Sequence, residues 1–493
     1  MKINPHIFRK NDIRGHADRD LTDAAVETIG ETLGVIINEE YGRDDGQAVT
    51  ITVGRDMRLH SPRIAAALIR GLRSQGINVK DLGMCPTPVS YFSQATIEEV
   101  TGSIMVTGSH NPPEFNGLKI TLNGRSVIEE LIQQLREKVY EAPAFPPAAA
   151  TGTYDHLELL PVYLDYLADQ FHQLLLFNRQ HNSPIKVIAD AGNGTAGLVL
   201  PDLFSRLGFD FSCLYCEPDG TLPHHHPDPT VEANLVDLQQ KVKEEGAHLG
   251  VAYDGDADRL GVVDDHGRII WGDQLLIIFA AEILKKHPDA AIVADVKCSQ
   301  TLFDAIERMG GRPIMWKTGH SLIKRKMKEE NALLAGEMSG HIFFAHRYFG
   351  YDDAIYATLR LLEIMAAKGR IVHDYHLSEV AGFLPTLCNT PELRHDCPDE
   401  IKFAVVERLR EQLFQCREDS HGCHCPEISK IITIDGVRVV FANGGWALVR
   451  ASNTQPVLVL RFEAENQKTL TMMQKFIRHQ LKLARSAVEK EAS

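Results

Sequence analysis

The feature that most constrains the fold of this chain is a pattern that occurs three times. An apolar, β-branched run leads into a loop of glycine and polar residues, then a helical stretch, then a second short strand: ITVGRD to INVKDLG, IKVIADAGNG to FDFSCLY, and AIVADVKCS to RPIMWKTG. This is the order of a βαβ unit, in which two parallel strands and a crossover helix bury a common core. The repeat predicts three α/β domains.

Changes in this pattern indicate where the domains meet. A Pro/Ala-rich stretch over 142–153 ends the first repeat, and a second seam is expected close to YDGDADRLGVV. After about residue 370 the order becomes helix, strands and a final amphipathic helix, which predicts a smaller α+β domain. We therefore predict four domains, over 1–153, 154–256, 257–370 and 371–493.

Composition excludes several classes of partner. The 493 residues include 66 Asp+Glu against 52 Lys+Arg, so the chain lacks the basic surface of a nucleic-acid binder. No apolar run reaches the ~18 residues of a membrane span. The first residues have no apolar h-region, so we expect a cytoplasmic protein without membrane partners. Nine cysteines, a sparse and odd set, indicate reduced thiols.

Three weaker patterns each allow two interpretations. The Cys/His cluster over 416–425 could bind zinc, but its spacing is not that of a standard finger, which favours a surface loop. His224–His226 lie between prolines, which favours an extended structural loop over a metal site. Gly192–Gly197 matches G-x-G-x-x-G with Glu217 downstream, as in dinucleotide-binding proteins, but it also suits any tight strand-to-helix turn.

The strongest local motif is SIMVTGSHNPPEFNGLKI, an apolar strand that ends abruptly before Ser109. Flanking Gly and Pro residues present the Ser109 hydroxyl at the carboxyl edge of the predicted sheet, where the sites of α/β proteins lie. Ser109 is therefore a candidate nucleophile, with a capping serine as the alternative. A serine hydrolase is not favoured, because there is no G-x-S-x-G elbow and His110 is the immediate neighbour.

A second motif, VAYDGDADRLGVV, places Asp254, Asp256 and Asp258 at every second position after an apolar strand. Three hard carboxylates on a short turn suit Mg²⁺, which prefers oxygen ligands. A calcium EF-hand is excluded, because Arg259 stands where that loop needs glycine and Asp265 where it needs glutamate. The sequence predicts a magnesium site, with a solvated acidic turn as the alternative.

Two further loops carry groups that suit a sugar phosphate. In AGEMSGHIFF, Glu337 and Ser339 lie between glycines and can hydrogen-bond vicinal sugar hydroxyls. In WALVRASNTQPVLVLRFEA, Arg450 can bind a phosphate with two parallel hydrogen bonds. The loop adds an anion nest built from Ser452, Asn453 and Thr454. An ordinary hairpin turn is the alternative for this last loop.

Taken together, six motifs in this order resemble those of the α-D-phosphohexomutases, in the phosphomannomutase/phosphoglucomutase group: FRKNDIRG, TGSHNPPEFNGLKI, DGDADR, TGHSLIKRKM, GEMSGH and RASNTQPVLVLRFEA. The resemblance spans nearly the whole chain. It implies four domains around a central cleft, three of them related α/β domains and the fourth a TBP-like α+β domain. Asn11, where the family often has tyrosine, and the loop over 416–425 depart from the family pattern.

The resemblance also implies roles for matching positions. Ser109 would be the phosphoserine that donates and recovers the phosphoryl group, and one of its oxygens would join the three aspartates around Mg²⁺. Glu337 and Ser339 would hold sugar hydroxyls, and the loop from Arg450 to Thr454 would hold the phosphate that is not reacting. The other implied catalytic residues are Arg14, His110 and Arg259, with Lys119 and His341 assigned to proton transfer. Lys297 and His320 would bind substrate.

The implied activity is reversible phosphoryl transfer between O1 and O6 of mannose and glucose phosphates. It would pass through a hexose 1,6-bisphosphate that also serves as activator, and the enzyme would be a monomer or weak homodimer. One alternative is a phosphoglucosamine mutase, although the sugar loop of that group usually reads GEQSGH where this chain has Met338. Another is a sugar-phosphate sensor without activity, against which the intact Ser109 and aspartates argue.

Overall fold

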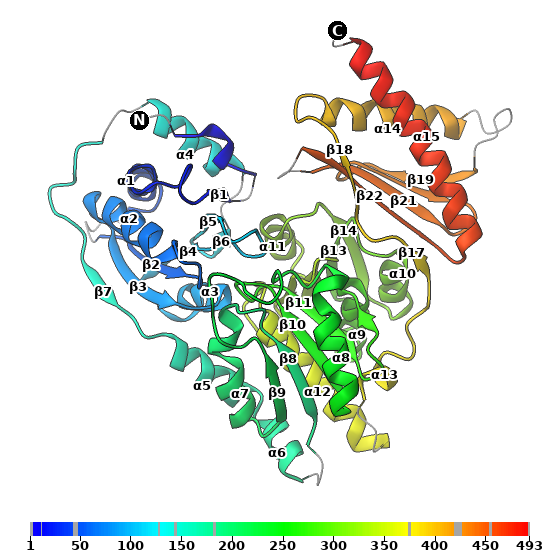
Figure 1. Cartoon of the computed structure of the whole chain (residues 1–493), viewed down its shortest axis with the longest axis horizontal. Coiled ribbons are helices and arrows are strands. Elements are labelled where there is room, and N and C mark those ends of the chain that lie inside the picture. Colours follow the sequence, from blue (N-terminus) through cyan, green and yellow to red (C-terminus); the bar gives the residue numbers. More distant parts are fainter. Residues whose placement is uncertain are drawn as a thin grey trace.

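The computed structural model describes residues 3–10, 12–42, 48–126, 129–141, 145–180, 184–372, 376–418, 426–452 and 456–491. Over these residues the chain forms four β-sheets, each with its own helices. Figure 1 shows the first domain in blue and the last in orange and red, with the green and yellow-green second and third domains beside and below them. Among the described residues, no helix combines the length and apolar character needed to cross a membrane.

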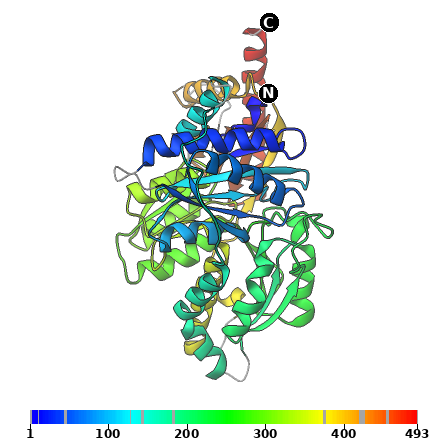
Figure 2. The same ribbon diagram turned by 90° about the vertical axis from the view of Figure 1, so that its left-hand side faces the viewer.

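The first domain has a seven-stranded sheet in the order β1-β5-β4-β2-β3-β7, with β6 paired to β5. Its strands are β1 (Ile13–His16), β2 (Thr50–Arg55), β3 (Asn78–Met84), β4 (Val100–Val106), β5 (Phe115–Leu122), β6 (Arg125–Ser126) and β7 (Tyr154–His156). Its helices are α1 (Asp23–Tyr41), α2 (Ser61–Ser74), α3 (Thr87–Thr96) and α4 (Glu129–Glu141). Figure 2 shows the long blue helix α1 running above the strands.

The backbones of helices α1 and α2 come into direct contact because a glycine of each helix lies where the two helices cross. A Cβ added to Gly71 would lie 2.2 Å from the carbonyl oxygen of Glu27, and one added to Gly30 would lie 2.6 Å from that of Leu68. Both distances are far below any van der Waals contact, so only glycine permits this packing. The close crossing holds α2, and with it the end of β2, in a fixed place.

The second domain contains a five-stranded sheet in the order β12-β11-β10-β8-β9. Its strands are β8 (Lys186–Asp190), β9 (Asp210–Leu214), β10 (Leu249–Tyr253), β11 (Leu260–Asp264) and β12 (Ile269–Ile270). Its helices are α5 (Leu160–Gln170), α6 (His172–Gln180), α7 (Leu200–Arg206) and α8 (Val236–Glu245). Strand β10 is buried along its whole length, as expected of a strand covered on both faces.

The third domain has a four-stranded sheet in the order β14-β13-β15-β16. Its strands are β13 (Ala291–Asp295), β14 (Arg312–Trp316), β15 (Leu334–Gly336) and β16 (Ile342–Phe344). Its helices are α9 (Gly272–Leu284), α10 (Gln300–Arg308), α11 (His320–Glu329) and α12 (Ala354–Val372), and the short α13 (Leu377–Val380) follows. Helix α9 is apolar almost all round and is buried between this sheet and its neighbours.

These three sheets share one topology, which confirms the repeat predicted from the sequence. In each, a central strand (β2, β8 or β13) is parallel to the next strand along the chain and to the one after that. A fourth strand (β5, β11 or β16) then returns antiparallel to the third. The βαβ units and the closing hairpin therefore recur in the same order in all three domains.

The fourth domain is an antiparallel sheet in the order β17-β22-β21-β20-β19, with β18 also paired to β22. Its strands are β17 (Cys388–Asn389), β18 (Leu393–Asp396), β19 (Ile428–Ile432), β20 (Val437–Phe441), β21 (Trp446–Ala451) and β22 (Val457–Ala464). Helices α14 (Lys402–Glu418) and α15 (Gln467–Glu491) share an apolar core with it. This arrangement confirms the predicted α+β domain.

The fourth domain docks on the third through a buried tryptophan. Trp446 and Leu448 pack against Val296, which follows β13. Arg438 lies over the Trp446 ring at 3.8 Å and donates hydrogen bonds to the carbonyl oxygens of Val296 (2.6 Å) and Cys298 (2.7 Å). These contacts tie the last domain to the turn after β13, which carries Lys297.

Strand pairing leads us to propose other positions for two of the expected domain boundaries. The seam between residues 256 and 257 falls in the loop that joins β10 to β11, and these strands pair in one sheet. We therefore propose that the second domain extends to β12. The seam at 153 and 154 falls just before β7, which pairs with β3, so we place β7 in the first domain. The last seam, at residue 370, lies within α12.

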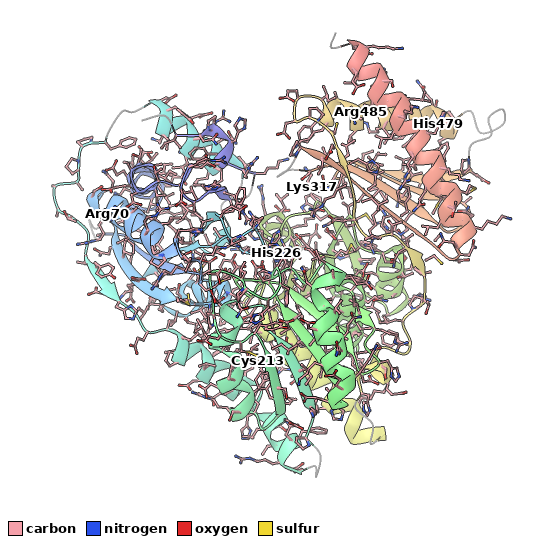
Figure 3. All side chains as sticks on the ribbon, in the orientation of Figure 1. Arg70, Cys213, His226, Lys317, His479 and Arg485 are labelled. Carbon is pink, nitrogen blue, oxygen red and sulfur yellow. A yellow bond between two sulfur atoms is a disulfide. The ribbon has the colours of Figure 1, made fainter. Side chains whose placement is uncertain are left out.

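One expectation about the cysteines is wrong. Cys213 and Cys216 form a disulfide at the end of β9, with their Cα atoms 5.9 Å apart, whereas the sparse, odd set of cysteines indicated reduced thiols. Figure 3 labels Cys213 in the second domain. The two residues meet because a tight turn at Tyr215, with a φ of 52°, brings the chain back on itself. Among the described residues the other five cysteines are free thiols.

Candidate active site

The motifs of the first three domains occupy one equivalent position. Each lies in the loop between the third strand of the repeat and the antiparallel fourth strand: β4–β5 carries Ser109, β10–β11 the three aspartates, and β15–β16 the Glu337 motif. The fourth-domain motif begins at the end of β21 with Arg450. The three domains therefore contribute topologically equivalent loops, and each loop carries different functional groups.

Ser109 is held in an uncommon backbone conformation with its hydroxyl aimed at the metal motif. Its φ of 50° lies in the left-handed region, and the side chain is 2% exposed. The hydroxyl donates a hydrogen bond to Oδ2 of Asp254 (2.7 Å) and lies 3.1 Å from Nδ1 of His110. Burial and the nearby Arg259 and Arg14 guanidinium groups lower the pKa of His110 well below its usual range.

Asp56 and Arg58, two residues that the sequence motifs do not include, hold the Ser109 loop in place and are called the clamp below. Arg58, which is 1% exposed, donates hydrogen bonds to the carbonyl oxygens of four loop residues. These acceptors are Ser109 (3.0 Å), Asn111 (2.5 Å), Pro112 (2.6 Å) and Phe115 (3.0 Å). Asp56 pairs with Arg58 (3.2 Å) and accepts from the backbone N–H of Gly108 (2.9 Å). The available signal was a charged pair directly after a buried strand, in GRDMR.

Replacing Arg58 by methionine is expected to lower the free energy of unfolding by about 3–5 kcal/mol, because the buried Asp56 carboxylate would lose its partner. Urea unfolding of the variant measures this loss. The control is Arg70→Met, which breaks an exposed 3.0 Å ion pair with Glu27 and should cost less than about 1 kcal/mol. Figure 3 shows Arg70 on the outside of the first domain. Equal losses for the two variants would contradict the clamp.

The three aspartates converge on one buried spot. Asp254, Asp256 and Asp258 are fully buried, and one carboxylate oxygen from each lies within 4.8 Å of the others. Lys119 on β5 donates to Asp256 (2.6 Å) and also to Asp258. Thr87, the first residue of α3, donates its hydroxyl to Asp256 (2.5 Å). The first domain therefore supplies a cation and a hydroxyl to the acidic loop of the second.

The electrostatics of this spot depend on Lys119. Burial and the neighbouring Asp258 and Asp256 carboxylates raise the pKa of Asp254 well above its usual range. Burial acts in the same direction on Asp256, but the Lys119 ammonium outweighs it and lowers the pKa of that carboxyl. Lys119 itself is buried, which alone would lower its pKa, but the carboxylates around it raise the value.

The donor set fits a divalent cation. Oδ1 of Asp256 and Oδ1 of Asp258 are buried, and neither has a hydrogen-bond partner among the described residues. Unpaired buried carboxylate oxygens are costly, and a hard cation with oxygen ligands satisfies them. The acidic loop therefore has both the geometry and the unsatisfied oxygens of a metal site.

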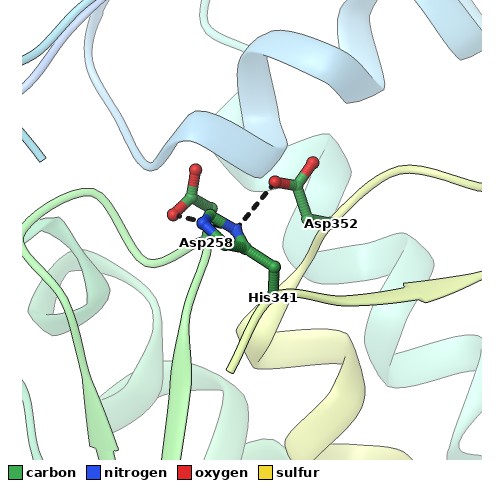
Figure 4. Close-up of side chains that lie close together, drawn as sticks. All are labelled: Asp258, His341 and Asp352. Carbon is green, nitrogen blue, oxygen red and sulfur yellow. Dashed lines mark ion pairs between the residues drawn. The ribbon is translucent and has the colours of Figure 1, made fainter. Parts of the chain in front are cut away.

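The third-domain loop joins this group through His341. Its Nε2 accepts a hydrogen bond from Nε of Arg259 (3.1 Å), and its Nδ1 lies 3.5 Å from Asp258 and 3.0 Å from Asp352. Figure 4 shows the His341 ring between these two carboxylates. The His320 ring stacks beside it, with the two ring centres 5.6 Å apart.

The two candidate sugar ligands of the same loop lie close together. Glu337 is buried, and its Oε1 accepts a hydrogen bond from the backbone N–H of Gly319 (2.8 Å). Its Oε2 accepts from the hydroxyl of Ser339 (3.1 Å). Burial raises the pKa of Glu337. The carboxylate is thus held by the turn before α11 and presented beside the Ser339 hydroxyl.

The remaining candidates lie on either side of these loops. Arg14 on β1 pairs with Asp12 (2.7 Å) and donates to the side chain of Asn111 (3.1 Å). Lys297 pairs with Glu392 (2.8 Å), at the start of the fourth domain. Arg450 pairs with Asp435 (3.0 Å). Ser452 follows β21, while Asn453 and Thr454 lie outside the described residues, as do Asn11 and residues 419–425 of the candidate zinc loop.

The glycine-rich loop after β8 supports the acidic loop. The backbone N–H of Thr195 donates to the carbonyl oxygen of Gly255 (3.0 Å), and the Thr195 hydroxyl contacts the same oxygen (3.2 Å). This geometry favours the tight-turn interpretation of GNGTAG. In the histidine loop that follows, His225 pairs with Asp190 at the end of β8 (2.9 Å), and this contact favours a structural role for that loop.

Comparison with known proteins gives matches along almost the whole chain. Four family models match in order, described as Phosphoglucomutase/phosphomannomutase alpha/beta/alpha domain I (residues 5–144), domain II (161–267), domain III (271–382) and C-terminal domain (392–480). The Phosphomannomutase/phosphoglucomutase of Pseudomonas aeruginosa is 44% identical over 482 residues, covering 98% of this chain and 96% of the relative. The Phosphoglucomutase of Neisseria gonorrhoeae is 41% identical, covering 96% of each.

Solved structures agree with these matches. A Phosphoglucomutase/phosphomannomutase family protein from Burkholderia thailandensis superposes with a TM-score of 0.86 at 38% identity, covering 98% of each chain. A Phosphoglucomutase of Paramecium in its open form, at 18% identity and a TM-score of 0.79, shares the fold. The repeated domains, the loops they bring together and these matches lead to one conclusion: the chain belongs to the phosphoglucomutase/phosphomannomutase family of enzymes.

Proposed function

We propose that this chain catalyses reversible phosphoryl transfer between O1 and O6 of glucose and mannose phosphates, through a phosphoserine at Ser109 and a hexose 1,6-bisphosphate. The observation that carries the proposal is the contact of the Ser109 hydroxyl with Asp254, inside the buried group of three aspartates and Lys119. A nucleophile beside a cation site is what phosphoryl transfer requires, because this reaction depends on positioning and charge neutralisation. The names of the relatives support the sugar class.

The acidic loop is assigned to Mg²⁺, held by Asp254, Asp256, Asp258 and an oxygen of phosphorylated Ser109. Bound there, the ion supplies positive charge that offsets the phosphoserine, which carries roughly −1.5 to −2 charges at neutral pH. Lys119 and Arg259 add two fixed positive charges from neighbouring elements, and Arg58 holds the backbone of the serine loop. These residues keep the phosphorus aligned for attack.

In the first half-reaction a free sugar hydroxyl attacks the phosphorus, the new oxygen–phosphorus bond forms, and the bond to the Ser109 oxygen breaks. The hydroxyl proton moves to His341, and the serine oxygen takes up a proton from Lys119, the second of the two groups assigned to proton transfer. The bisphosphate then turns end for end. Its other phosphoryl group returns to Ser109, and the isomeric monophosphate leaves.

Turning over requires a second phosphate site, which we assign to the fourth domain. Arg450, Ser452, Asn453 and Thr454 would bind the phosphate that is not reacting, while Lys297 and His320 contact the substrate from the third domain. Arg450 pairs with Asp435, and Asp435 also accepts a hydrogen bond from the backbone N–H of Thr318 (3.2 Å). The proposed phosphate-binding loop of the fourth domain therefore lies against the third domain. Glu337 and Ser339 would bind the C3 and C4 hydroxyls, which glucose and mannose share.

The proposal includes action as a monomer or weak homodimer. A coupled assay with glucose 1-phosphate, mannose 1-phosphate and glucosamine 1-phosphate, each with Mg²⁺ and catalytic bisphosphate, tests the proposal. We expect turnover of the first two, with less of the third because Met338 stands in the sugar loop. Turnover of glucosamine 1-phosphate alone would favour a phosphoglucosamine mutase. No turnover and no phosphate on Ser109 would favour a sensor.

A further inference from the structure

We propose that Asp352 is a positioning residue, which fixes the ring orientation and tautomer of His341 for proton transfer. The proposal rests on the function proposed above, in which His341 exchanges a proton with the sugar hydroxyl. It assigns a role to a residue outside the six sequence motifs. Asp352 is fully buried and lies in the segment after β16, where it bridges to Phe343.

The hydrogen bonds of His341 determine its tautomer. Nε of Arg259 donates to Nε2 of His341 at 3.1 Å. A guanidinium nitrogen can only donate, so Nε2 must offer its lone pair and carry no hydrogen. The ring hydrogen is therefore on Nδ1, and this nitrogen faces Oδ2 of Asp352 at 3.0 Å (Figure 4). This contact is an ion pair, and a carboxylate placed against one ring nitrogen favours the tautomer that carries the hydrogen on that nitrogen.

The available nitrogen is on the side of the nucleophile. Nε2 contacts Arg259, and another nitrogen of Arg259 lies 3.5 Å from His110, the neighbour of Ser109. Nδ1 lies closest to Asp352 (3.0 Å), with Asp258 of the acidic loop at 3.5 Å. With the hydrogen on Nδ1, the lone pair of Nε2 points toward Arg259, whose guanidinium also reaches the serine loop at His110.

Asp352 is itself held from the far side. Its Oδ1 accepts a hydrogen bond from the Lys324 ammonium (3.0 Å), which lies over the Tyr91 ring at 4.0 Å. The other oxygen, Oδ2, makes ion-pair contacts with Nδ1 of His341 (3.0 Å) and Nδ1 of His320 (3.8 Å). This arrangement keeps the carboxylate from rotating away from His341.

The neighbouring residue, Asp353, anchors the segment that carries Asp352 to the protein core. Asp353 points into the core, where its Oδ2 accepts from the hydroxyls of Tyr163 (2.8 Å) and Tyr348 (2.7 Å). Its Oδ1 accepts from the backbone N–H of Tyr356 (2.8 Å). Two adjacent buried aspartates thus face opposite ways, one toward the tyrosines and one toward His341. Asp353 offers a matched control for Asp352.

A double-mutant cycle tests whether Asp352 acts through His341. Asp352→Asn is expected to lower kcat by roughly 10- to 100-fold with little change in KM, as loss of a carboxylate that orients a functional histidine does. In the His341→Gln background, the same substitution should change kcat by less than about 2-fold, because residues that act as a unit are not additive. A full effect in both backgrounds would overturn the proposal.

Asp353→Asn separates positioning from stability. It is expected to lower the midpoint of thermal unfolding at least as much as Asp352→Asn, because it removes a charge from the tyrosine cluster. Its effect on kcat should be the same with and without His341. If Asp353→Asn shows the same coupling to His341 as Asp352→Asn, the effect belongs to the whole segment, and the assignment to Asp352 is wrong.

The tautomer can also be measured directly in the unaltered enzyme. Nitrogen-15 NMR of histidine-labelled protein, with the His341 signals identified by their loss in His341→Gln, should show hydrogen on Nδ1. Asp352→Asn should shift the signals toward a mixture of tautomers, whereas Asp353→Asn should leave them unchanged. Hydrogen on Nε2 in the wild type would refute the assignment even if the enzyme is active, and absence of mutase activity would instead refute the proposed function.

Discussion

Replacing Ser109 by alanine is expected to lower kcat for hexose phosphates by at least roughly 1,000-fold, because a covalent mechanism cannot proceed without its nucleophile. The substitution removes only the hydroxyl. The loop retains its other supports, since the Ser109 carbonyl still accepts from Arg58 and the Ser109 N–H still donates to Thr107. The folded structure should therefore survive the loss of activity.

Phosphate labelling checks the reason for this loss. After incubation with a radiolabelled hexose bisphosphate, the wild type should carry label on one serine and Ser109→Ala none. Ser93→Ala is the control, since Ser93 is equally buried but bonds to the carbonyl oxygen of Ser90 (2.6 Å) in the helix α3. That variant should keep both label and activity. Label retained in Ser109→Ala would mean that another residue is the nucleophile.

Removal of divalent metal is expected to lower activity by at least about 100-fold, and added Mg²⁺ should restore it. A phosphoserine next to three buried carboxylates leaves several negative charges that Lys119 and Arg259 do not neutralise. The charge stabilisation lost amounts to several kcal/mol, and each 1.4 kcal/mol is about a factor of ten in rate. Dialysis against EDTA followed by titration with MgCl₂ measures both effects.

Two variants make the metal experiment specific to the acidic loop. Asp256→Asn should raise the Mg²⁺ concentration needed for half-maximal activity, because it removes one of the three carboxylates. Asp265 lies on the next hairpin, where it accepts a hydrogen bond from the hydroxyl of Ser378 (2.9 Å). The variant Asp265→Asn should therefore leave the Mg²⁺ requirement unchanged. Full activity of the EDTA-treated wild type would exclude the assigned role of the loop.

Patterns local in sequence predicted much of this fold. The strand–helix–strand repeats specify three sheets because alternation of apolar strands and crossover helices leaves few ways to bury a common core. The loops at the strand ends were predictable for the same reason. Ser109 and the three aspartates could be picked out as candidates because they come within a few residues of the ends of buried strands, where polar side chains often bind a ligand.

What escaped prediction depends on contacts between distant segments. Arg58 acts on a loop some fifty residues away, and Asp352 contacts His341 from the other side of β16. Neither contact can be recognised in the sequence from a periodic pattern or a motif, because both residue types are also common in ordinary turns. We propose a later seam than the one expected near residue 256, because the aspartate loop, which looks like a connection between domains, closes a hairpin within one sheet. Pairing of strands can only be judged in three dimensions.

The repeated hairpin loop bears on how such an enzyme could arise. Three copies of one topology carry the nucleophile, the acidic loop and the sugar loop at the same connection. In each copy the loop is flanked by strands of that copy's own sheet, so its sequence can change without redesigning the cores of the others. Duplication of a single ancestral unit, followed by divergence of one loop per copy, would therefore have divided the chemical tasks among scaffolds that share one core topology.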